Sequence, residues 1–425
     1  MLTRKNAVVV VDAYSGGRHL IGAYQALGFP VVHVQSGWPS YFEADNDAAR
    51  RQADRHVVAA EHTDDALVAL LREERARVVV AGAESAVLLA DHLNDALDLP
   101  FRNAASTSNR RRDKFEMQQT VAAAGLASIV QRRVETVTEL DTWLHEHGRR
   151  PVVVKPLRSA GSDGVHVCHS RDEAVAALAE ILDRPDMFGA ANGAALCQEF
   201  LVGDEYVLNG VVCNGVFAVT EGWRSDKLDH QGARVYDTQY LFCPDDPHHE
   251  EIAGYVERVC AALGIENGPF HAEVMLTTRG PVLIEVGARI AGGADPYFIE
   301  TCLGRSQISA VVSSSLHPAG CAEALRTAPR PRPVRRAAYV YLIARVAGTV
   351  ERLALDGFFD VEGVGTVAYR YAVGDHQQLT RDLLTAAGVV TVTAPDHDRL
   401  AAAIRDVREV EAAMYAATVA GGVIA

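Results

Sequence analysis

The sequence lacks the features that mark several large classes of protein. Its seven cysteines are scattered, with no C-x-x-C pair and no His/Cys cluster, so we expect reduced thiols rather than a disulfide framework or a zinc site. No apolar run is long enough to span a bilayer, and the run at residues 7–11 is too short for a signal sequence. We find neither an internal repeat nor a low-complexity tract. The expectation is a soluble, cytoplasmic protein.

An excess of basic charge is also missing. The formal net charge is −14, which argues against a nucleic-acid or anionic-membrane surface. Any phosphate ligand must therefore be held by a local basic cluster. Hydrophobic residues make up 48% and charged residues 23% of the chain, as in ordinary globular proteins. A length of 425 residues exceeds what one core usually supports, so several domains are expected.

The first hundred residues alternate apolar β runs with helical stretches, a pattern typical of a parallel sheet covered by helices. The turn Ser15-Gly16-Gly17 lacks the spacing of a dinucleotide fingerprint, so we interpret it as a tight turn and expect no NAD there. The predicted strands are residues 7–11, 31–34, 57–60 and 78–81. One predicted helix ends at Leu27, and two others cover residues 66–74 and 85–97.

Beyond a helix at 111–124, which Gly125 ends, strands come in pairs joined by Gly-containing turns. Paired antiparallel strands with intervening helices predict α+β units. The Pro- and Arg-rich segment 326–336 is the clearest linker. The predicted pairs are 152–155 with 165–168 and 195–201 with 206–212, with helices at 172–182 and 251–263. After the linker we expect strands at 338–345 and 365–371, a helix, a strand at 389–392 and a terminal helix at 397–417.

The most informative stretch is a predicted hairpin around Arg279 that places Glu273 opposite Glu285. Two opposed carboxylates about 5 Å apart repel by about 3 kcal/mol at an effective dielectric near 20. A cation between them removes this cost, and Mg²⁺ typically binds one or two carboxylates plus substrate phosphates. The alternative is an exposed hairpin whose carboxylates diverge into solvent. Arg289 favours the metal site because its guanidinium matches a phosphate group.

Lys155 ends a buried-type strand and is followed by a small, Gly-rich turn that contains Ser159, Gly161 and Ser162. Backbone N–H groups of such a turn can cradle phosphate oxygens, and the lysine supplies a point charge. An ordinary hairpin loop with an exposed lysine is the more common explanation of this pattern when it is taken alone. The metal hairpin further along the chain favours the phosphate interpretation.

Residues 197–205 join two predicted strands through a Gly-Asp turn. The strand edge offers backbone groups to a purine, and Glu205 would reach a ribose hydroxyl. A hairpin with a charged rim explains the pattern equally well.

Other candidate residues have weaker signals. His271 shares a strand face with Glu273 and would shuttle a proton from an amine, although a lone histidine in a strand is more often structural. Trp223 and Arg224 lie in a Gly-rich connection that would line a substrate pocket or form an exposed loop. Gly292 and Gly293 leave room for a substrate close to the backbone.

Taken in order along the chain, these residues resemble the ATP-grasp superfamily, and among its members the carboxylate–amine ligases that join amino acids into dipeptides. The resemblance covers nearly the whole chain. It implies a mixed α/β and α+β fold with a Rossmann-like domain (1–108), an ATP-grasp small lobe (109–194), a large lobe with the Mg²⁺ site (195–328) and a C-terminal α/β domain (329–425). The residues that carry it are Lys114, Lys155, Gln198, Glu199, Leu201, Glu205, Glu273, Glu285 and Arg289.

The resemblance also implies roles for these residues. Lys114 and Lys155 would contact the ATP phosphates, under a flap formed by residues 159–164. Gln198, Glu205 and the backbone of Glu199 and Leu201 would hold adenine and ribose. Glu273 and Glu285 would hold Mg²⁺, with Mn²⁺ as an alternative, and Arg289 would stabilise the transferring phosphoryl group. One departure is Gly287, where the family usually has an Asn that binds metal, so the number of metal ions is open.

The predicted function is ATP-dependent amide formation between a small carboxylate and an amine, with an acyl-phosphate intermediate and ADP and phosphate as products. Three alternatives stay open: a carboxylase that uses carboxyphosphate, a kinase of the same fold, and a non-catalytic ATP-binding protein. The family also suggests a homodimer. Neither substrate can be identified from the sequence.

Overall fold

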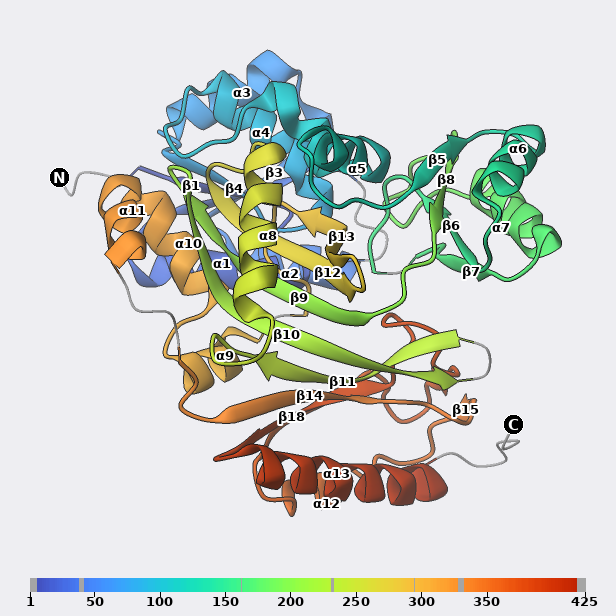
Figure 1. Cartoon of the computed structure of the whole chain (residues 1–425). Helices are drawn as coiled ribbons and strands as arrows, with labels where there is room; N and C mark the ends of the chain where they lie inside the picture. The colour runs from blue at the N-terminus through green and yellow to red at the C-terminus, as the bar shows by residue number, and fades with distance from the viewer. Residues whose placement is uncertain are drawn as a thin grey trace.

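The computed structural model describes residues 6–37, 42–161, 163–230, 233–293, 295–327 and 332–418. Three main sheets follow one another along the chain, as the colour gradient of Figure 1 shows. A parallel sheet comes first, a small antiparallel sheet second, and a large antiparallel sheet occupies the rest. The mixed α/β and α+β content expected from the sequence is confirmed by this arrangement.

The N-terminal part is a four-stranded parallel sheet in the order β3-β2-β1-β4. Its central strands are buried on both faces, which explains their continuous runs of valine. The third strand begins and ends two residues earlier than predicted, because residues 59–61 form a 3₁₀ turn. The elements are β1 (Val8–Val11), α1 (His19–Ala26), β2 (Val31–Gln35), α2 (Glu43–Gln52), β3 (Arg55–Val58), α3 (Asp64–Glu73), β4 (Val78–Ala81) and α4 (Val87–Ala96).

The small antiparallel sheet has the order β5-β8-β6-β7 and is covered by two helices. The helix before it ends at Gly125, whose φ of +74° fits the predicted stop. The elements are α5 (Lys114–Ala123), β5 (Gln131–Val134), α6 (Val137–His147), β6 (Val152–Pro156), β7 (His166–Cys168), α7 (Arg171–Asp183) and β8 (Ala195–Glu199).

One predicted strand pair is wrong. The strand at 195–201 does not pair with the strand at 206–212: β8 pairs with β5 and β6, whereas β9 (Asp204–Cys213) pairs with β10 (Val216–His230) and β12 (Gly268–Thr277) in the large sheet. Two apolar runs around a Gly-Asp step look like a hairpin, but residues 200–203 carry the chain from one sheet to the other.

The large sheet has eight strands in the order β13-β12-β9-β10-β11-β14-β18-β16. It continues into the C-terminal part of the chain because β14 pairs with β11. The sequence analysis did not predict its long central strands β10 and β11. The further strands are β11 (Ala233–Phe242), β13 (Gly280–Gly287), β14 (Arg336–Leu342), β16 (Val364–Tyr369) and β18 (Gly388–Ala394), and β15 (Gly348–Thr349) pairs with β17 (His376–Gln377) in a separate ribbon.

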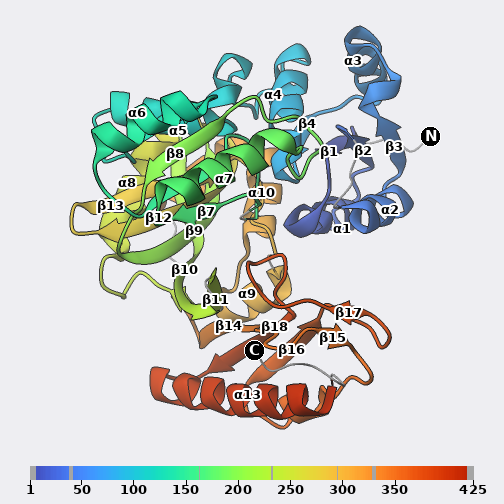
Figure 2. The same ribbon diagram turned by 90° about the vertical axis from the view of Figure 1, so that its right-hand side faces the viewer.

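Helices cover the large sheet, and Figure 2 shows α13 beneath its C-terminal strands. The helix predicted between β16 and β18 is wrong, because that connection contains only β17 and turns, and a short helix, α12, precedes β16 instead. Residues 328–331 of the predicted linker lie outside the described residues. Among the described helices, none is long and apolar enough to cross a membrane. They are α8 (His249–Ala262), α9 (Pro296–Leu303), α10 (Gln307–Leu316), α11 (Pro318–Thr327), α12 (Asp356–Phe359) and α13 (His397–Thr418).

Candidate active site

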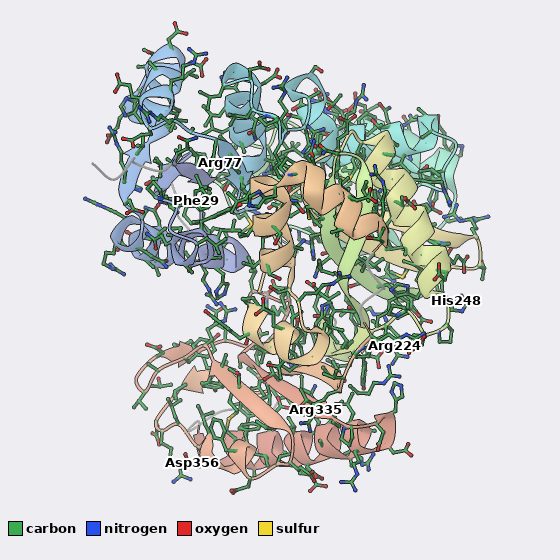
Figure 3. All side chains as sticks on the ribbon, turned by 90° about the vertical axis from the view of Figure 1, so that its left-hand side faces the viewer. Phe29, Arg77, Arg224, His248, Arg335 and Asp356 are labelled. Atoms are coloured by element: carbon green, nitrogen blue, oxygen red, sulfur yellow. The ribbon has the colours of Figure 1, made fainter. Side chains whose placement is uncertain are left out.

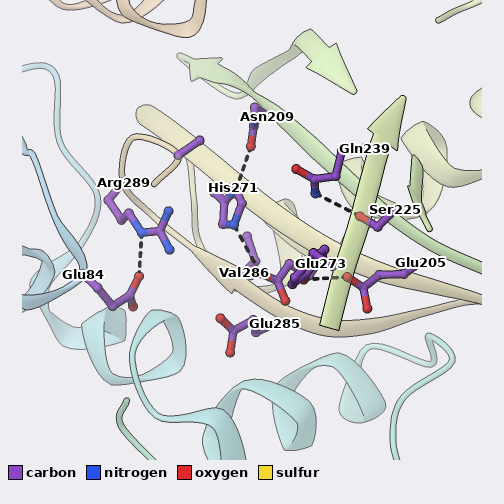
Figure 4. A network of polar contacts seen from close by, with 12 residues as sticks. Glu84, Glu205, Asn209, Ser225, Gln239, His271, Glu273, Glu285, Val286 and Arg289 are labelled. Carbon is purple, nitrogen blue, oxygen red and sulfur yellow. Dashed lines mark hydrogen bonds and ion pairs between the residues drawn. The ribbon is translucent and has the colours of Figure 1, made fainter. Parts of the chain in front are cut away.

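Glu273 and Glu285 face each other across β12 and β13, as predicted, but for a different reason. The turn of the hairpin is the two-residue step between Thr277 and Gly280, which by itself would place Glu273 opposite Ile284. A β-bulge after Glu273 leaves Ile284 without a partner and moves the register by one residue. In Figure 4 the two carboxylates lie close together.

Lys114 links the hairpin to the loop that follows β6 of the small antiparallel sheet. It is the first residue of α5, where the side chain of Asp113 caps the helix by accepting hydrogen bonds from the N–H groups of Phe115 and Glu116. From this fixed position the Lys114 ammonium lies 2.9 Å from Glu285 Oε2 and donates to the carbonyl of Ser159 at 2.6 Å. The lysine therefore connects the hairpin that carries Glu273 and Glu285 with the start of the Gly-rich turn.

Charges converge at this point and perturb one another. Burial lowers the pKa of Lys155 to about 8, and the nearby Lys114 ammonium adds to the effect against the attraction of Glu285 and Glu273. Burial alone would raise the pKa of Glu285, but Lys114 and Lys155 outweigh it and lower the value to about 2. Glu285 is therefore ionised at neutral pH, as a metal ligand must be.

The Gly-rich turn is held by one internal hydrogen bond and lies close to the C-terminal part of the chain. Ser159 is buried and its hydroxyl donates to Asp163 at 2.6 Å. Gly161 has a φ of +65°, and a Cβ there would lie 3.2 Å from Leu384 of the C-terminal domain. Ser162 lies outside the described residues. The turn thus contacts Lys114 through Ser159 and approaches Leu384, in the loop before β18, at Gly161.

Arg289 meets an acidic residue from the N-terminal sheet. Its Nε lies 2.9 Å from Glu84 Oε2, and Arg112 approaches the other oxygen of Glu84 at 3.5 Å. A Cβ at Gly287 would lie 2.6 Å from Glu84 Oε2. Gly287 therefore leaves room for the Glu84 carboxylate, which lies beside Arg289 in Figure 4.

His271 contacts Glu273 on the same strand face, as predicted. Its Nε2 lies 3.4 Å from Glu273 Oε1, and its Nδ1 lies 2.7 Å from the side-chain oxygen of Asn209 on β9. Both imidazole nitrogens are thus engaged, and the ring is mostly buried.

A cavity of about 520 Å³ contains many of these groups, a volume typical of a small-molecule site. The predicted site residues that line it are Gly161, Trp223, His271, Glu273, Glu285, Arg289, Gly292 and Gly293. Those outside its lining are Lys114, Lys155, Ser159, Gln198, Glu199, Leu201, Glu205 and Arg224.

The residues expected to hold adenine and ribose lie around the crossing from β8 to β9. Gln198 is buried and donates to Gln131 at 3.1 Å, Glu199 accepts from Arg279 at 2.7 Å, and Leu201 packs in a small apolar cluster. Glu205 accepts from Lys227 at 2.6 Å and from the Tyr236 hydroxyl at 2.8 Å. None of these four residues lines the 520 Å³ cavity itself, although Glu205 is hydrogen-bonded to Tyr236, which does.

Trp223 and Arg224 lie in strand β10, not in the loop that was predicted. Neighbouring residues of a strand point to opposite faces, so only one of the two can face the cavity. Trp223 lines it and packs against Tyr339 with ring centroids 4.6 Å apart. Arg224 is exposed, contacts Asp226 and lies over the ring of Tyr240 near the outer surface (Figure 3). The expectation that it lines the pocket is therefore wrong.

The central part of the chain, residues 148–296, matches the model of the ATP-grasp domain family. The chain is 46% identical to dapdiamide A synthase from Enterobacter agglomerans over 416 residues, which is 98% of both chains. The chain belongs to the ATP-grasp family. The expected ATP-grasp ligase, an enzyme that forms carbon–nitrogen bonds, is thereby confirmed.

Solved structures show the same ATP-grasp fold across almost the whole chain. An L-amino acid ligase from Bacillus licheniformis superposes with a TM-score of 0.73 at 20% identity, covering 96% of this chain and 98% of its own. A carboxyaminoimidazole ribonucleotide synthase from Aspergillus clavatus, solved with ATP, superposes with a TM-score of 0.70 at 16% identity, covering 96% and 99%. At these identities the likeness shows the fold alone.

Sequence analysis missed much of the wall of this ATP-grasp cavity. Glu84 could have been found, because it follows the carboxyl end of a parallel strand, where such sheets bind ligands. The aromatic and C-terminal residues carry no local motif. The missed residues that line the cavity include Ser15, Phe42, Met187, Phe188, Tyr236, Gln239, Tyr339, Tyr341, Tyr369, Arg370 and Leu384.

Proposed function

We propose that this ATP-grasp ligase activates a small carboxylate as an acyl phosphate and joins it to an amine, releasing ADP and phosphate. One observation carries the proposal: the opposed pair Glu273 and Glu285 lies with Arg289 in a cavity that also has an extensive apolar and aromatic wall. A phosphate-binding end beside an apolar pocket suits a reaction between ATP and small organic substrates. The 46% identity to a dapdiamide synthase supports amide formation.

Each charged residue would have a role that depends on its position in the site. Lys114 and Lys155 would bind ATP phosphate oxygens as point charges, since their ammonium groups act on the metal hairpin from the small lobe. Arg289 would hold the migrating phosphoryl group and the acyl phosphate with its planar guanidinium. To do so it must exchange its contact with Glu84 for one with the substrate.

The residues fit Mg²⁺. Glu273 and Glu285 offer two opposed carboxylates, and the low pKa of Glu285 keeps that group deprotonated. Mg²⁺ characteristically takes one or two protein carboxylates and completes its shell with water and phosphates. When bound, it would neutralise phosphate charge during transfer. Among the described residues, no group of three or more His, Cys, Asp and Glu side chains forms a further metal site.

The Gly-rich turn would exclude water from the intermediate. Its Gly161 already lies against Leu384, and Met187 and Phe188 line the same cavity. A closed lid matters here because an acyl phosphate hydrolyses if water reaches it.

Phosphate release from Mg-ATP against a matrix of paired amino acids and other amines tests the proposal, with Glu285→Gln as the blank. Release that requires both a carboxylate and an amine, with ADP as co-product, is the expected result. Release that depends on bicarbonate would favour a carboxyphosphate enzyme instead. Formation of AMP would refute the acyl-phosphate route.

A further inference from the structure

A second cavity lies along an unpaired stretch of β10, apart from the active site. Its volume is about 380 Å³, within the range of small-molecule sites, and it shares no lining residue with the 520 Å³ cavity. Residues 216–221 of β10 pair with β9 on one side, but β11 joins the other side only from Gly222 onward. Among the described residues no strand covers this edge, and side chains from α8, α9 and α11 surround the cavity there.

The wall of the second cavity includes a buried carboxylate. Glu221 lines this cavity, is only 2% exposed and has no role in the reaction proposed above. Neither of its oxygens has a hydrogen-bond partner among the described residues, although the side chains of Thr220 and Asn209 lie nearby. Burial raises the pKa of Glu221 to about 7. An unpaired buried carboxylate costs stability, and a ligand that donates hydrogen bonds to Glu221 would remove part of this cost.

An arginine of opposite charge lies at the same cavity. Arg305, between α9 and α10, donates from Nη2 to the carbonyl of Val219 at 3.2 Å. Its Nε is buried and has no hydrogen-bond partner among the described residues. Burial lowers the pKa of Arg305, and the Glu221 charge opposes this shift, yet neither Glu221 oxygen accepts a hydrogen bond from the guanidinium. The cavity therefore contains a negative and a positive group that attract each other without being hydrogen-bonded.

The rest of the lining suits an apolar group. Three further charged residues, Glu250, Glu257 and Arg326, are exposed, so solvent and salt screen their charges. Apolar side chains from β10, from the end of β11 and from the three helices form much of the wall. They are Phe217, Val219, Phe242, Ala253, Leu303 and Leu325. A ligand that matches this cavity has one positive group, one negative group and an apolar part.

We propose that the 380 Å³ cavity is a second binding site, separate from the active site, and that it takes an α-amino acid with an apolar side chain. The ammonium group of the ligand would donate hydrogen bonds to Glu221, and its carboxylate would accept them from Arg305. Its side chain would contact the apolar wall. A zwitterion pairs both protein groups at once, whereas a ligand with a single charge would leave either Glu221 or Arg305 without a partner.

Titration calorimetry of the full chain with L-leucine, in the absence of ATP and Mg²⁺, tests this proposal. Two analogues each lack one charge: isocaproate has no ammonium group, and isoamylamine has no carboxylate. We expect the wild type to bind leucine at least about tenfold more tightly than either analogue. Glu221→Gln should remove most of the advantage of leucine over isocaproate, because a neutral amide is a weaker partner for an ammonium group. Arg305→Gln should remove most of its advantage over isoamylamine.

Two further variants separate the cavity from its charges. Glu257→Gln is the matched control, because it removes an exposed carboxylate from the same cavity and should change the affinity for leucine by less than about twofold. Gly254→Leu leaves both buried charges in place. A Cβ at Gly254 would meet only Arg258 Nη1, at 3.9 Å, so a larger side chain has room to extend from α8 into the cavity and should abolish the binding that depends on Glu221.

Leucine that is bound in the active site would respond to none of these substitutions. The same affinity for leucine in the wild type, Glu221→Gln and Gly254→Leu would therefore overturn the proposal. A wild-type protein that binds none of L-leucine, L-valine and L-phenylalanine would also overturn it. The proposed ligase function does not enter this test, because neither ATP turnover nor amide formation is measured.

Discussion

Replacing Lys155 by Met should make the protein more stable while it abolishes turnover. Lys155 is 5% exposed, and its pKa falls from 10.5 to about 8 because burial and Lys114 disfavour the charged form. The value already includes the attraction of Glu285 and Glu273. A whole pKa unit corresponds to about 1.4 kcal/mol, so the charged lysine costs the folded state about 3 kcal/mol at pH 7. Methionine occupies similar space and carries no charge.

The stability difference between the wild type and Lys155→Met should depend on pH. Because the unfolded chain binds the Lys155 proton more tightly than the folded protein, the stability of the wild type should rise as the pH increases from about 8 to about 10.5. The variant lacks this titration, so its advantage should be complete below about pH 8 and should disappear toward pH 10.5.

Urea unfolding of the wild type and Lys155→Met at pH 7 and at pH 10.5 measures the effect. Lys227→Met is the matched control, because that lysine pairs with the buried Glu205 at 2.6 Å and its loss should destabilise the protein. A variant that is less stable than the wild type at pH 7, or whose advantage persists at pH 10.5, would show that the Lys155 charge is well compensated in the folded state.

Three further predictions concern the site itself. Glu285→Gln should lose at least a hundredfold in kcat and should also lower the melting temperature, because it leaves Lys114 and Lys155 without their carboxylate partner; a turnover near that of the wild type would remove Glu285 from the proposed metal site. Gly287→Ala places a Cβ 2.6 Å from Glu84. Because that carboxylate is the mobile end of a side chain, we expect the unfolding free energy to change by less than about 1 kcal/mol, whereas kcat should fall about a hundredfold. A loss of stability as large as the loss of activity, when both are expressed as free energies, would contradict this. Leu384→Ala should loosen the contact with Gly161 and raise phosphate release relative to amide formed, which assays of both products would detect; an unchanged ratio would argue against the lid.

The part of the site that could be predicted from the sequence is the part encoded locally. Glu273 and Glu285 lie on one hairpin, where alternation and a turn signal indicate their faces, and Arg289 follows it by two residues. Even there the register depends on a bulge at Ile284 that nothing in the local sequence indicates. The valine-rich parallel strands were equally readable, because burial on both faces leaves a continuous apolar run.

The remaining parts depend on contacts between distant segments. Nothing near residue 199 indicates that the chain crosses to another sheet instead of turning back, since both paths use the same apolar runs. Glu84 reaches Arg289 only because the N-terminal sheet packs beside the hairpin. Such residues acquire their roles through packing, which a single sequence does not show.

The continuous large sheet constrains how this enzyme can be recombined. The C-terminal strands join it through three residue pairs between β11 and β14, and one of these pairs, Gln239 with Tyr339, consists of two residues that line the cavity. These three pairs therefore connect the C-terminal strands to the large sheet and also form part of the pocket wall. A chimera that takes its C-terminal segment from a relative would inherit the relative's pocket only if it kept this three-pair register. A shift of one residue would turn Tyr339 away from Trp223 and invert the faces of β14. The substrate range of such a chimera would thus depend on the register between β11 and β14.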